Sequence, residues 1–391
     1  MLLAWCYFNE MNIKKVYKMR KTGRYETLGS IKYFIPDSLP PQNPPLELNQ
    51  ATMVLFGEAM HHLGKLNEMS HHIPDTRRFI KAYVVKEALL SSAIEGVHTT
   101  MLDVFTQPLL DVRPSKSTQL VMNYTQALNL SIAMIKKEGI PILNRVILAA
   151  HKTLMEKGEG EKSDPGNYRK QSVKVGNLIP PPPNHIPDLM AQLEQFINVD
   201  DTLPPLIKAG LTHVQFETIH PFLDGNGRIG RLLIVLMLIS SDLLSEPLLY
   251  PSYYFKKHHL KYYHLLDAVR TEGAYEEWIS FYLKAIKETS IDAFNRAKDI
   301  QLLEHDLAER IKEKYQKTVS SRLQALSVIF SFPVINISEM AQQLDVAFNT
   351  ANQIISDFVK EDILVEETRQ KRGKLYKFKP YLDILEREYI D

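Results

Sequence analysis

The chain has 391 residues, of which 45% are hydrophobic and 24% charged, as in an ordinary folded protein of two or three domains. Its formal net charge of +1 provides no overall field that would attract nucleic acid or a membrane surface. The single cysteine, Cys6, excludes an intramolecular disulfide and a cysteine-based metal cluster, and it fits a cytoplasmic location.

The first part of the chain, residues 1–50, is predicted to be an extended segment. Five prolines between 34 and 45 forbid a helix there and favour extended backbone. Helical spacing begins after this segment, in a region over 51–135. Within that region, apolar residues recur at helical steps over about 75–96, and Gly96 is a typical helix stop.

The middle of the chain is predicted to be mainly helical, with one exception. Over 166–183, Val173 and Val175 alternate with polar residues, and Gly176-Asn177 favours a tight turn, so this stretch predicts a β-hairpin. In the helix predicted over 229–240, the run between Arg231 and Asp242 has ten residues, against roughly 20 needed to cross a bilayer. No membrane partner is therefore expected. The helices are predicted over 115–135, 140–156, 186–199, 204–219 and 229–240.

The last part of the chain is predicted to contain long charged helices and then a separable unit. Over about 275–318, Leu303, Leu307 and Ile311 repeat at four-residue steps, which is typical of a packing seam. Residues 320–391 show helix–turn–helix spacing, followed by two strands around a basic turn.

The stretch HPFLDGNGRIGR begins at His220 and combines flexible and charged residues beside the apolar run. Gly225 and Gly227 carry no side chain, so backbone N–H groups at the start of the next helix can approach an anion closely. Together with Asn226 they predict an anion nest suited to phosphate. Phe222 is expected to point into the core and anchor the turn.

Charged side chains surround this nest. Arg228 and Arg231 are three residues apart, on one helix face, where they can hold a polyphosphate. Asp224 precedes the nest, and a carboxylate beside phosphate oxygens implies a bridging Mg²⁺. His220 ends the preceding helix because Pro221 prevents its continuation, and an imidazole there can take a proton near neutral pH. Each residue alone also suits a structural role, but their combination favours a nucleotide site.

The stretch resembles the Fic family signature, His-x-Phe-x-(Asp/Glu)-Gly-Asn-Gly-Arg-x-x-Arg, at every specified position. The resemblance implies a mainly α fold: a Fic-type helical bundle with a small β-hairpin flap. It also implies a protein adenylyltransferase that moves AMP from ATP to a Ser, Thr or Tyr hydroxyl of a protein, its own included, and releases pyrophosphate.

The resemblance assigns a role to each residue of the stretch. His220 would be the general base, and Asp224 would hold Mg²⁺ against the phosphates. The backbone from Gly225 to Gly227, with Asn226, would bind the α-phosphate. Arg228 and Arg231 would hold the β- and γ-phosphates.

The upstream stretch SSAIEG, from Ser91 to Gly96, resembles the family's inhibitory helix motif, (Ser/Thr)-x-x-x-Glu-(Gly/Asn). By resemblance, Glu95 would pair with Arg231 and deny it to the γ-phosphate, because a carboxylate and a phosphate compete for one guanidinium. Ser91 and Glu95 are expected on one helical face. Without the resemblance, Glu95 is an ordinary surface glutamate. The family also leaves open an enzyme that removes AMP, with Glu95 orienting water.

Two further stretches match positions that contact the nucleotide or the target in the family. VKVGNL, from Val173, matches the flap that lays a target segment across the site by main-chain pairing. Tyr262 and Tyr263 lie where relatives place tyrosines near the adenine, although two aromatics at helical spacing also suit a core. The other expected nucleotide contacts are Val175, Gly176, Asn177, Leu178, Ile229 and Gly230.

The unit over 320–391 resembles a winged helix of one bacterial subgroup. The helix Phe348–Phe358, which would enter a DNA groove, has no Lys or Arg, and phosphate contacts dominate DNA affinity. The turn Arg369–Lys379, in contrast, has six basic residues and no acidic one. DNA therefore stays an alternative partner, beside a protein-docking or structural role.

The main hypothesis is an adenylyltransferase that uses ATP and Mg²⁺ and is inhibited by Glu95. The rival is a DNA-binding transcriptional regulator whose Fic core is a vestigial nucleotide sensor. A homodimer is left open.

The chain is expected to have five parts. They are an extended segment over 1–50, a helical region over 51–135 with the inhibitory helix at about 75–96, a Fic catalytic core over 136–275, a helical linker over 276–319 and a winged helix over 320–391.

Overall fold

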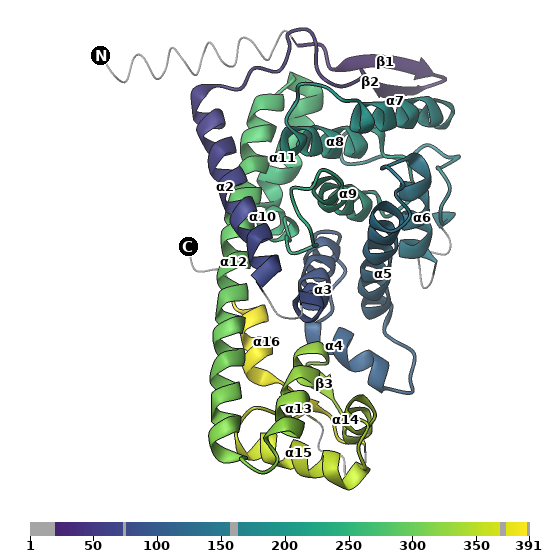
Figure 1. Ribbon diagram of the computed structural model, residues 1–391. Helices are drawn as coiled ribbons and strands as arrows, with labels where there is room; N and C mark the ends of the chain where they lie inside the picture. Colours follow the sequence, from purple (N-terminus) through teal and green to yellow (C-terminus); the bar gives the residue numbers. More distant parts are fainter. Residues whose placement is uncertain (1–19, 73–75, 157–162, 368–372, 389–391) are drawn as a thin grey trace.

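The computed structural model describes residues 20–72, 76–156, 163–367 and 373–388. These residues form a mainly helical fold with two small antiparallel sheets (Figure 1), which confirms the predicted fold class. Buried side chains from 35 to 385 form one continuous hydrophobic core. Cys6 lies outside the described residues.

The helices before the motif end where local rules predict. Gly96, with φ of +79°, follows the end of the predicted inhibitory helix, since glycine adopts left-handed backbone without strain. Thr100 and Asp103 form a capping box at the start of a short helix. The predicted entry at Pro74 lies outside the described residues. These elements are α2 (Gln50–His72), α3 (Thr76–Ile94), α4 (Met101–Thr106), the 3-10 turn η1 (Gln107–Leu109), α5 (Lys116–Lys136) and α6 (Asn144–Met155).

The helices from α7 to α12 include one that is much longer than expected. The region predicted as several helices over 275–318 is a single helix, α12, of 40 residues. On it, Leu307 and Ile311 of the predicted seam are buried, and Leu303 packs against the core. The elements are η3 (Pro183–His185), α7 (Ile186–Asn198), α8 (Pro205–Ile219), α9 (Asn226–Ser240), α10 (Ser252–Lys257), α11 (His259–Glu272) and α12 (Tyr275–Lys314).

Helix α9 lies in the middle of the upper part of the molecule in Figure 1. Every residue from 228 to 239 on it is buried. A helix that is apolar on all sides must be surrounded by other elements, and α3, α5, α6 and α8 contact it. The helix that carries the motif is therefore held from several sides.

The segment over 1–50 contains a hairpin that the sequence did not predict. Strand β1 (Gly23–Leu28) pairs with β2 (Ile31–Pro36) in an antiparallel register in which Tyr25 faces Phe34. Aromatic and β-branched residues favour strands, but the dense prolines that follow them dominated the prediction. Three consecutive residues of β2, from Tyr33 to Ile35, are buried, so the hairpin is anchored to the helices.

The C-terminal part has the helices and strands that the sequence predicts. The helix–turn–helix pair consists of α14 and α15, and the two later strands are β4 and β5, which join β3 in the order β3-β5-β4. Residues 368–372 of the basic turn lie outside the described residues. The elements are α13 (Val319–Ser331), β3 (Val334–Ile335), α14 (Ile337–Leu344), α15 (Phe348–Lys360), β4 (Val365–Glu366), β5 (Tyr376–Lys377) and α16 (Lys379–Glu386).

Helix α16 connects this C-terminal part to the rest of the molecule. It lies beside α12 in Figure 1. Arg296 of α12 donates to the carbonyl oxygens of Ile384 and Leu385, and Lys86 of α3 donates to that of Leu385 at 2.6 Å. The unit expected to be separable therefore shares polar contacts with α12 and with α3, the predicted inhibitory helix. Along the part of the chain that the structure describes, no helix is both long and apolar enough to span a bilayer.

Candidate active site

The turn between α8 and α9 is built by two left-handed residues. His220 caps the C-terminus of α8 with φ of 51° and ψ of 61°, directly before Pro221, as predicted. Gly225 is the N-cap of α9 with φ of 82°. The first N–H groups of α9 have no partner within the helix, so they form a cluster of donors at its N-terminus.

The side chain of Asn226 holds this turn closed. Its Oδ1 accepts from the N–H of Phe222 at 2.9 Å, and its Nδ2 donates to the carbonyl of Phe222, also at 2.9 Å. The Phe222 ring is fully buried, as predicted, and stacks on His151 at a centroid distance of 3.7 Å. The oxygen and the nitrogen of the Asn226 side-chain amide both form hydrogen bonds inside the turn. Asn226 can therefore face a phosphate only through its main chain.

We expect Asn226→Ala to destabilise the fold by about 1–3 kcal/mol, because it leaves the buried N–H and carbonyl of Phe222 unpaired. Urea unfolding measures the change. Asn198→Ala is the matched control, since exposed Asn198 also donates to two carbonyls but water can replace those bonds. Equal effects of the two substitutions would contradict the assigned role of Asn226.

His220 is held as a neutral imidazole. Its Nδ1 lies 3.3 Å from the carbonyl oxygen of Glu217, and Arg169 donates from Nε to the carbonyl of His220 at 2.8 Å. Burial lowers the pKa of His220 to about 4, despite the backbone hydrogen bond that opposes the shift. With its proton on Nδ1, the ring presents the Nε2 lone pair to accept a proton at neutral pH.

His151 supports the turn from α6, and no pattern in the sequence points to it. Its Nδ1 accepts from the N–H of Gly166 at 3.0 Å, so its Nε2 carries the proton and donates to the carbonyl of Asp224 at 3.0 Å. Burial lowers its pKa to about 4. A lone histidine on a helix is common, and only its stacking on Phe222 in the folded chain reveals its function as a positioning residue.

Arg228 carries positive charge that protein groups pair only weakly. Its Nη2 lies 3.4 Å from Oδ1 of Asp224 and 3.7 Å from the Met155 sulfur. Its Nε and Nη1 are buried and have no hydrogen-bond partner among the described residues. The Asp224 side chain is 59% exposed. The N-terminus of α9 therefore offers unsatisfied donors and an accessible carboxylate together.

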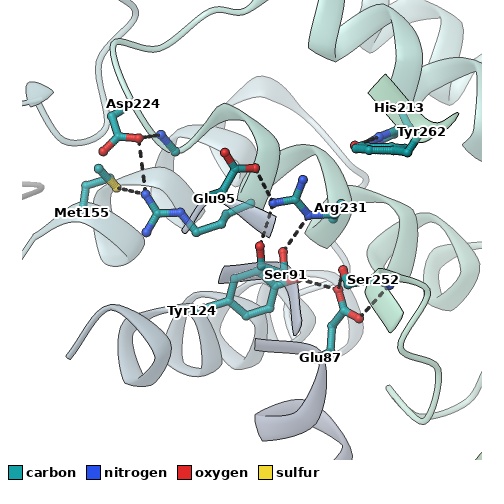
Figure 2. A network of polar contacts seen from close by, with 12 residues as sticks. Glu87, Ser91, Glu95, Tyr124, Met155, His213, Asp224, Arg231, Ser252 and Tyr262 are labelled. Atoms are coloured by element: carbon teal, nitrogen blue, oxygen red, sulfur yellow. Dashed lines mark hydrogen bonds and ion pairs between the residues drawn. The ribbon is translucent and has the colours of Figure 1, made fainter. Parts of the chain in front are cut away.

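Arg231, one turn further along α9, is paired with Ser91 at the end of α3 and with Glu95, which directly follows this helix. Its Nε donates to Oγ of Ser91 and its Nη2 to the Ser91 carbonyl, each at 2.9 Å, and Nη2 also lies 2.7 Å from Oε1 of Glu95 (Figure 2). Burial opposes ionisation of Glu95, but the guanidinium outweighs it and lowers the Glu95 pKa. The expected contact of Glu95 with Arg231 is present.

A second carboxylate, which is buried, lies below this pair on α3. Glu87 accepts from the hydroxyl and the N–H of Ser252 and from the hydroxyl of Tyr124 (Figure 2). Burial raises the pKa of Glu87 to about 7. Glu87, Ser91 and Glu95 follow one another at four-residue steps, so α3 turns a single polar edge toward Arg231.

The glycines of α9 leave room for carboxylates. A Cβ on Gly227 would overlap the carboxylate of Glu95, and one on Gly230 would lie 2.7 Å from Oε1 of Glu217. The side chain of Ile229 is buried in the core, so Ile229 and Gly230 can reach a nucleotide only through the main chain. Oε1 of Glu217 is buried without a hydrogen-bond partner among the described residues, and burial raises its pKa to about 7.

Glu217 is expected to make stability fall as pH rises. Its pKa in the fold, about 7, lies above its usual 4.5, so the unfolded chain loses this proton first and the cost develops between these two pH values. Glu217→Gln should remove a decline of about 3 kcal/mol at most. Urea unfolding at pH 5 and pH 8 measures it. Identical pH dependence of this variant and wild type would refute the assignment. Exposed Glu156→Gln serves as the control.

The two tyrosines of α11 differ in position. Tyr262 is 1% exposed, stacks on Phe255 at 4.8 Å, and its hydroxyl lies 2.9 Å from Nε2 of His213. Its ring packs in the aromatic core, and its contact with the adenine stays a prediction. Tyr263 is 46% exposed and stays a predicted contact.

The predicted flap is present in reduced form. Val175 and Leu178 form an isolated bridge with two hydrogen bonds of 2.9 Å around Gly176, whose φ is +57°. Neither arm is long enough to form a strand, so the predicted hairpin is one turn. Strand β2 supports its base, because the N–H of Phe34 donates to the carbonyl of Ile179 at 2.9 Å. Asn177, between Gly176 and Leu178, is exposed.

No group of three or more His, Cys, Asp or Glu side chains suited to a metal occurs within the described ranges. Asp224 is therefore the carboxylate at the α9 N-terminus on which a magnesium site would depend. Mg²⁺ in nucleotide sites commonly takes one or two carboxylates and completes its shell with phosphates and water. The exposed Asp224 side chain fits that use.

Comparison with known proteins identifies two matching segments. Residues 53–133 match the N-terminal region of the Fic/DOC family, and residues 141–238 match the Fic/DOC family itself. The protein adenylyltransferases Fic of Drosophila erecta and Drosophila melanogaster are each 30% identical to the chain, over 220 and 222 residues respectively. The matches cover 54% of this chain and 42% of each relative, so the chain spans less than half the length of these relatives.

Solved structures show a similar fold. A Fic family protein from Desulfovibrio desulfuricans G20 superposes with a TM-score of 0.54 at 21% identity, over 86% of this chain and 98% of that one. Fic-1 from C. elegans superposes with a TM-score of 0.50 at 17% identity, over 66% and 75% of the two chains. The helical bundle around α9 therefore has the expected Fic fold.

Proposed function

Residues 53–133 and 141–238 belong to the Fic/DOC family, and from this premise we propose that the chain is a protein adenylyltransferase. It transfers AMP from ATP to a Ser, Thr or Tyr hydroxyl of a protein and releases pyrophosphate. The observation that carries the proposal is the turn at the start of α9, where the neutral imidazole of His220 adjoins unpaired backbone donors and the unsatisfied guanidinium of Arg228.

Each residue has a chemical task in this reaction. Nε2 of His220 takes the proton from the target hydroxyl, whose oxygen attacks the α-phosphorus while the bond to the pyrophosphate oxygen breaks. Backbone N–H groups from Gly225 to Gly227 stabilise the charge on the α-phosphate, and that of Gly225 must first leave Oδ1 of Asp224, to which it donates at 2.5 Å. Arg228 binds the outer phosphates, and Arg231 joins it when released from α3. Bound Mg²⁺ supplies charge neutralisation between phosphates, and Asp224 would hold it.

Autoinhibition by Glu95 is part of the proposal. The Glu95 carboxylate and Ser91 occupy the guanidinium of Arg231, so a γ-phosphate meets a cation that is already neutralised. The carboxylate also covers Gly227, which lies in the proposed anion nest. A triphosphate therefore binds productively only after the end of α3 moves or Glu95 is removed.

The proposed partners are proteins, and the chain itself is one of them. The target segment would lie along the Val175–Leu178 turn, where the exposed side chain of Val175 would contact it. We keep the cytoplasmic location and the homodimer as parts of the proposal. We also propose that α13–α15 with β3–β5 form a winged helix, on the basis of their order and the β3-β5-β4 sheet.

Labelled ATP tests the function. The protein and its Glu95→Gly variant are incubated with ATP labelled on the α- or the γ-phosphate, with magnesium and cell lysate, and resolved on a denaturing gel. Label from the α-position alone on any protein supports AMP transfer. Label from the γ-position, or none with either variant, contradicts the proposal. Release of label from a protein AMPylated beforehand would identify the reverse activity, with Glu95 orienting water.

DNA binding is the second candidate function. Helix α15 exposes Asn349, Thr350, Asn352 and Gln353, which are side chains that can hydrogen-bond base edges. Its N-terminal half has no basic residue to contact phosphates. A gel shift with genomic fragments decides the question. DNA binding that disappears on replacing Lys374 and Lys377, together with no AMP transfer, would favour the regulator.

A further inference from the structure

A cavity lies away from the turn at His220, where α3, α4, η1 and α5 meet β3 and α14 of the C-terminal part. Its volume is about 220 Å³. Helix α4 and strand β3, which contribute to its lining, lie next to each other in the lower part of Figure 1. Lys81 of α3 lines it, 14 residues before Glu95, which corresponds to about 21 Å along a helix axis. The cavity is therefore separate from the proposed nucleotide site.

The walls of this cavity are apolar and its mouth is polar. Val85 from α3, Val104 and Phe105 from α4, and Val334 from β3 are buried walls. Lys81 and Gln126 at the mouth are exposed. Water needs two to four polar partners to be stable in a cavity, and the walls offer few. An apolar group is the better occupant of the interior.

Lys81 gives the cavity a cation that has no carboxylate partner in the part of the chain that the structure describes. No carboxylate lies within 4.0 Å of its Nζ among the described residues, and its neighbours are the ring faces of Phe332 and Phe105, at 4.8 and 5.9 Å from the ring centroids. Although Lys81 is partly exposed at the mouth, the apolar surroundings of its ammonium lower its pKa, and the charge of Glu339 opposes this shift. An ammonium between two rings is best stabilised by an anion.

Glu339 is the other charged residue of the lining, but its carboxylate is already engaged. Its Oε1 accepts from Nε2 of Gln343 at 2.8 Å on the same helix. Glu339 is therefore a weaker anchor for a ligand than Lys81, whose ammonium has no carboxylate within 4.0 Å among the described residues.

We propose that this cavity binds a small amphipathic carboxylate, with the carboxylate on Lys81 and the apolar tail between Phe105 and Phe332. A volume of about 220 Å³, at about 30 Å³ for each water-sized group, holds about seven non-hydrogen atoms. The seven apolar carbons of octanoate match this size. A bound ligand contacts α3 and β3 together and links the C-terminal part to the helix that carries Glu95. The binding site is independent of the proposed transferase activity.

Isothermal titration of the full chain with octanoate tests the proposal, with octanol and octylamine as comparison ligands. Octanoate is expected to bind about tenfold or more tightly than either, because a charge-assisted hydrogen bond has that effect. Lys81→Met should weaken octanoate binding by a similar factor. Lys32→Met is the matched control, since Lys32 lies over the ring of Tyr25 at 4.3 Å, outside the cavity, and it should leave binding unchanged.

A second variant fills the cavity from the half-buried residue Leu109 of η1. Leu109→Trp should abolish octanoate binding while the far-ultraviolet circular dichroism stays that of wild type. Three results would overturn the proposal: no binding of octanoate to wild type, equal binding of octylamine, or undiminished binding to both Lys81→Met and Leu109→Trp. None of these measurements depends on AMP transfer, so failure here is distinct from failure of the proposed enzyme.

Discussion

Replacement of His220 by alanine is expected to reduce AMP transfer by about 10²–10⁴-fold, the usual contribution of a general base. The imidazole is neutral, and its Nδ1 faces the Glu217 carbonyl at 3.3 Å. His151 is the other imidazole near the N-terminus of α9, but both of its ring nitrogens already form hydrogen bonds. Label transfer from α-labelled ATP measures the loss.

The control for this prediction is ATP binding, which His220→Ala should leave nearly unchanged because the ring contributes no charge to the phosphates. The pH profile is a second check. Since the pKa of His220 is lowered to about 4, the base is deprotonated above that value, and transfer should be flat between pH 6 and 8. A decline as pH falls through 6.5 would mean that the ring titrates as in free solution, and equal activity of the variant would refute its role.

Replacement of Glu95 by glycine is expected to raise transfer by about 10–100-fold. The carboxylate forms a charge-assisted hydrogen bond of 2.7 Å with Arg231, and such a bond contributes about 1.5–3 kcal/mol. That free energy no longer opposes the γ-phosphate once the carboxylate is gone. Steady-state labelling at fixed ATP measures the gain. Glu95→Gln, which keeps the shape without the charge, should give a smaller gain in the same direction.

The matched control is Glu58→Gln, which breaks a surface ion pair with Lys287 of the same 2.7 Å length and should not change transfer. The pH dependence gives a further test. Because the pKa of Glu95 is lowered from 4.5, its charge persists throughout the neutral range, and the ratio between variant and wild type should stay constant from pH 6 to 8. No gain in Glu95→Gly would remove the inhibitory role while leaving the transferase proposal intact.

Local sequence determined the helices and the turn that carries the site. A proline after His220 ends α8, a glycine that tolerates φ of 82° starts α9 at Gly225, and an apolar run on every face forces α9 into the interior. These features depend on steric and hydrogen-bonding rules that act within a few residues, so the sequence alone predicts them. The residues themselves also predicted a base, a Mg²⁺ carboxylate and an anion nest at this turn, and resemblance to the Fic family added the reaction and the phosphate that each residue would contact. These roles stay predictions.

Only the tertiary structure decided which distant residues meet. Ser91 and Glu95 contact Arg231 across more than 130 positions. Tyr262 packs in an aromatic core, and residues 275–314 form one helix because α2 and α16 pack along it. His151 and Lys81 acquire their significance solely from the rings and carbonyls that folding places beside them. Packing angles between helices depend on the whole set of side chains that they bury, and no short stretch of the chain contains that information.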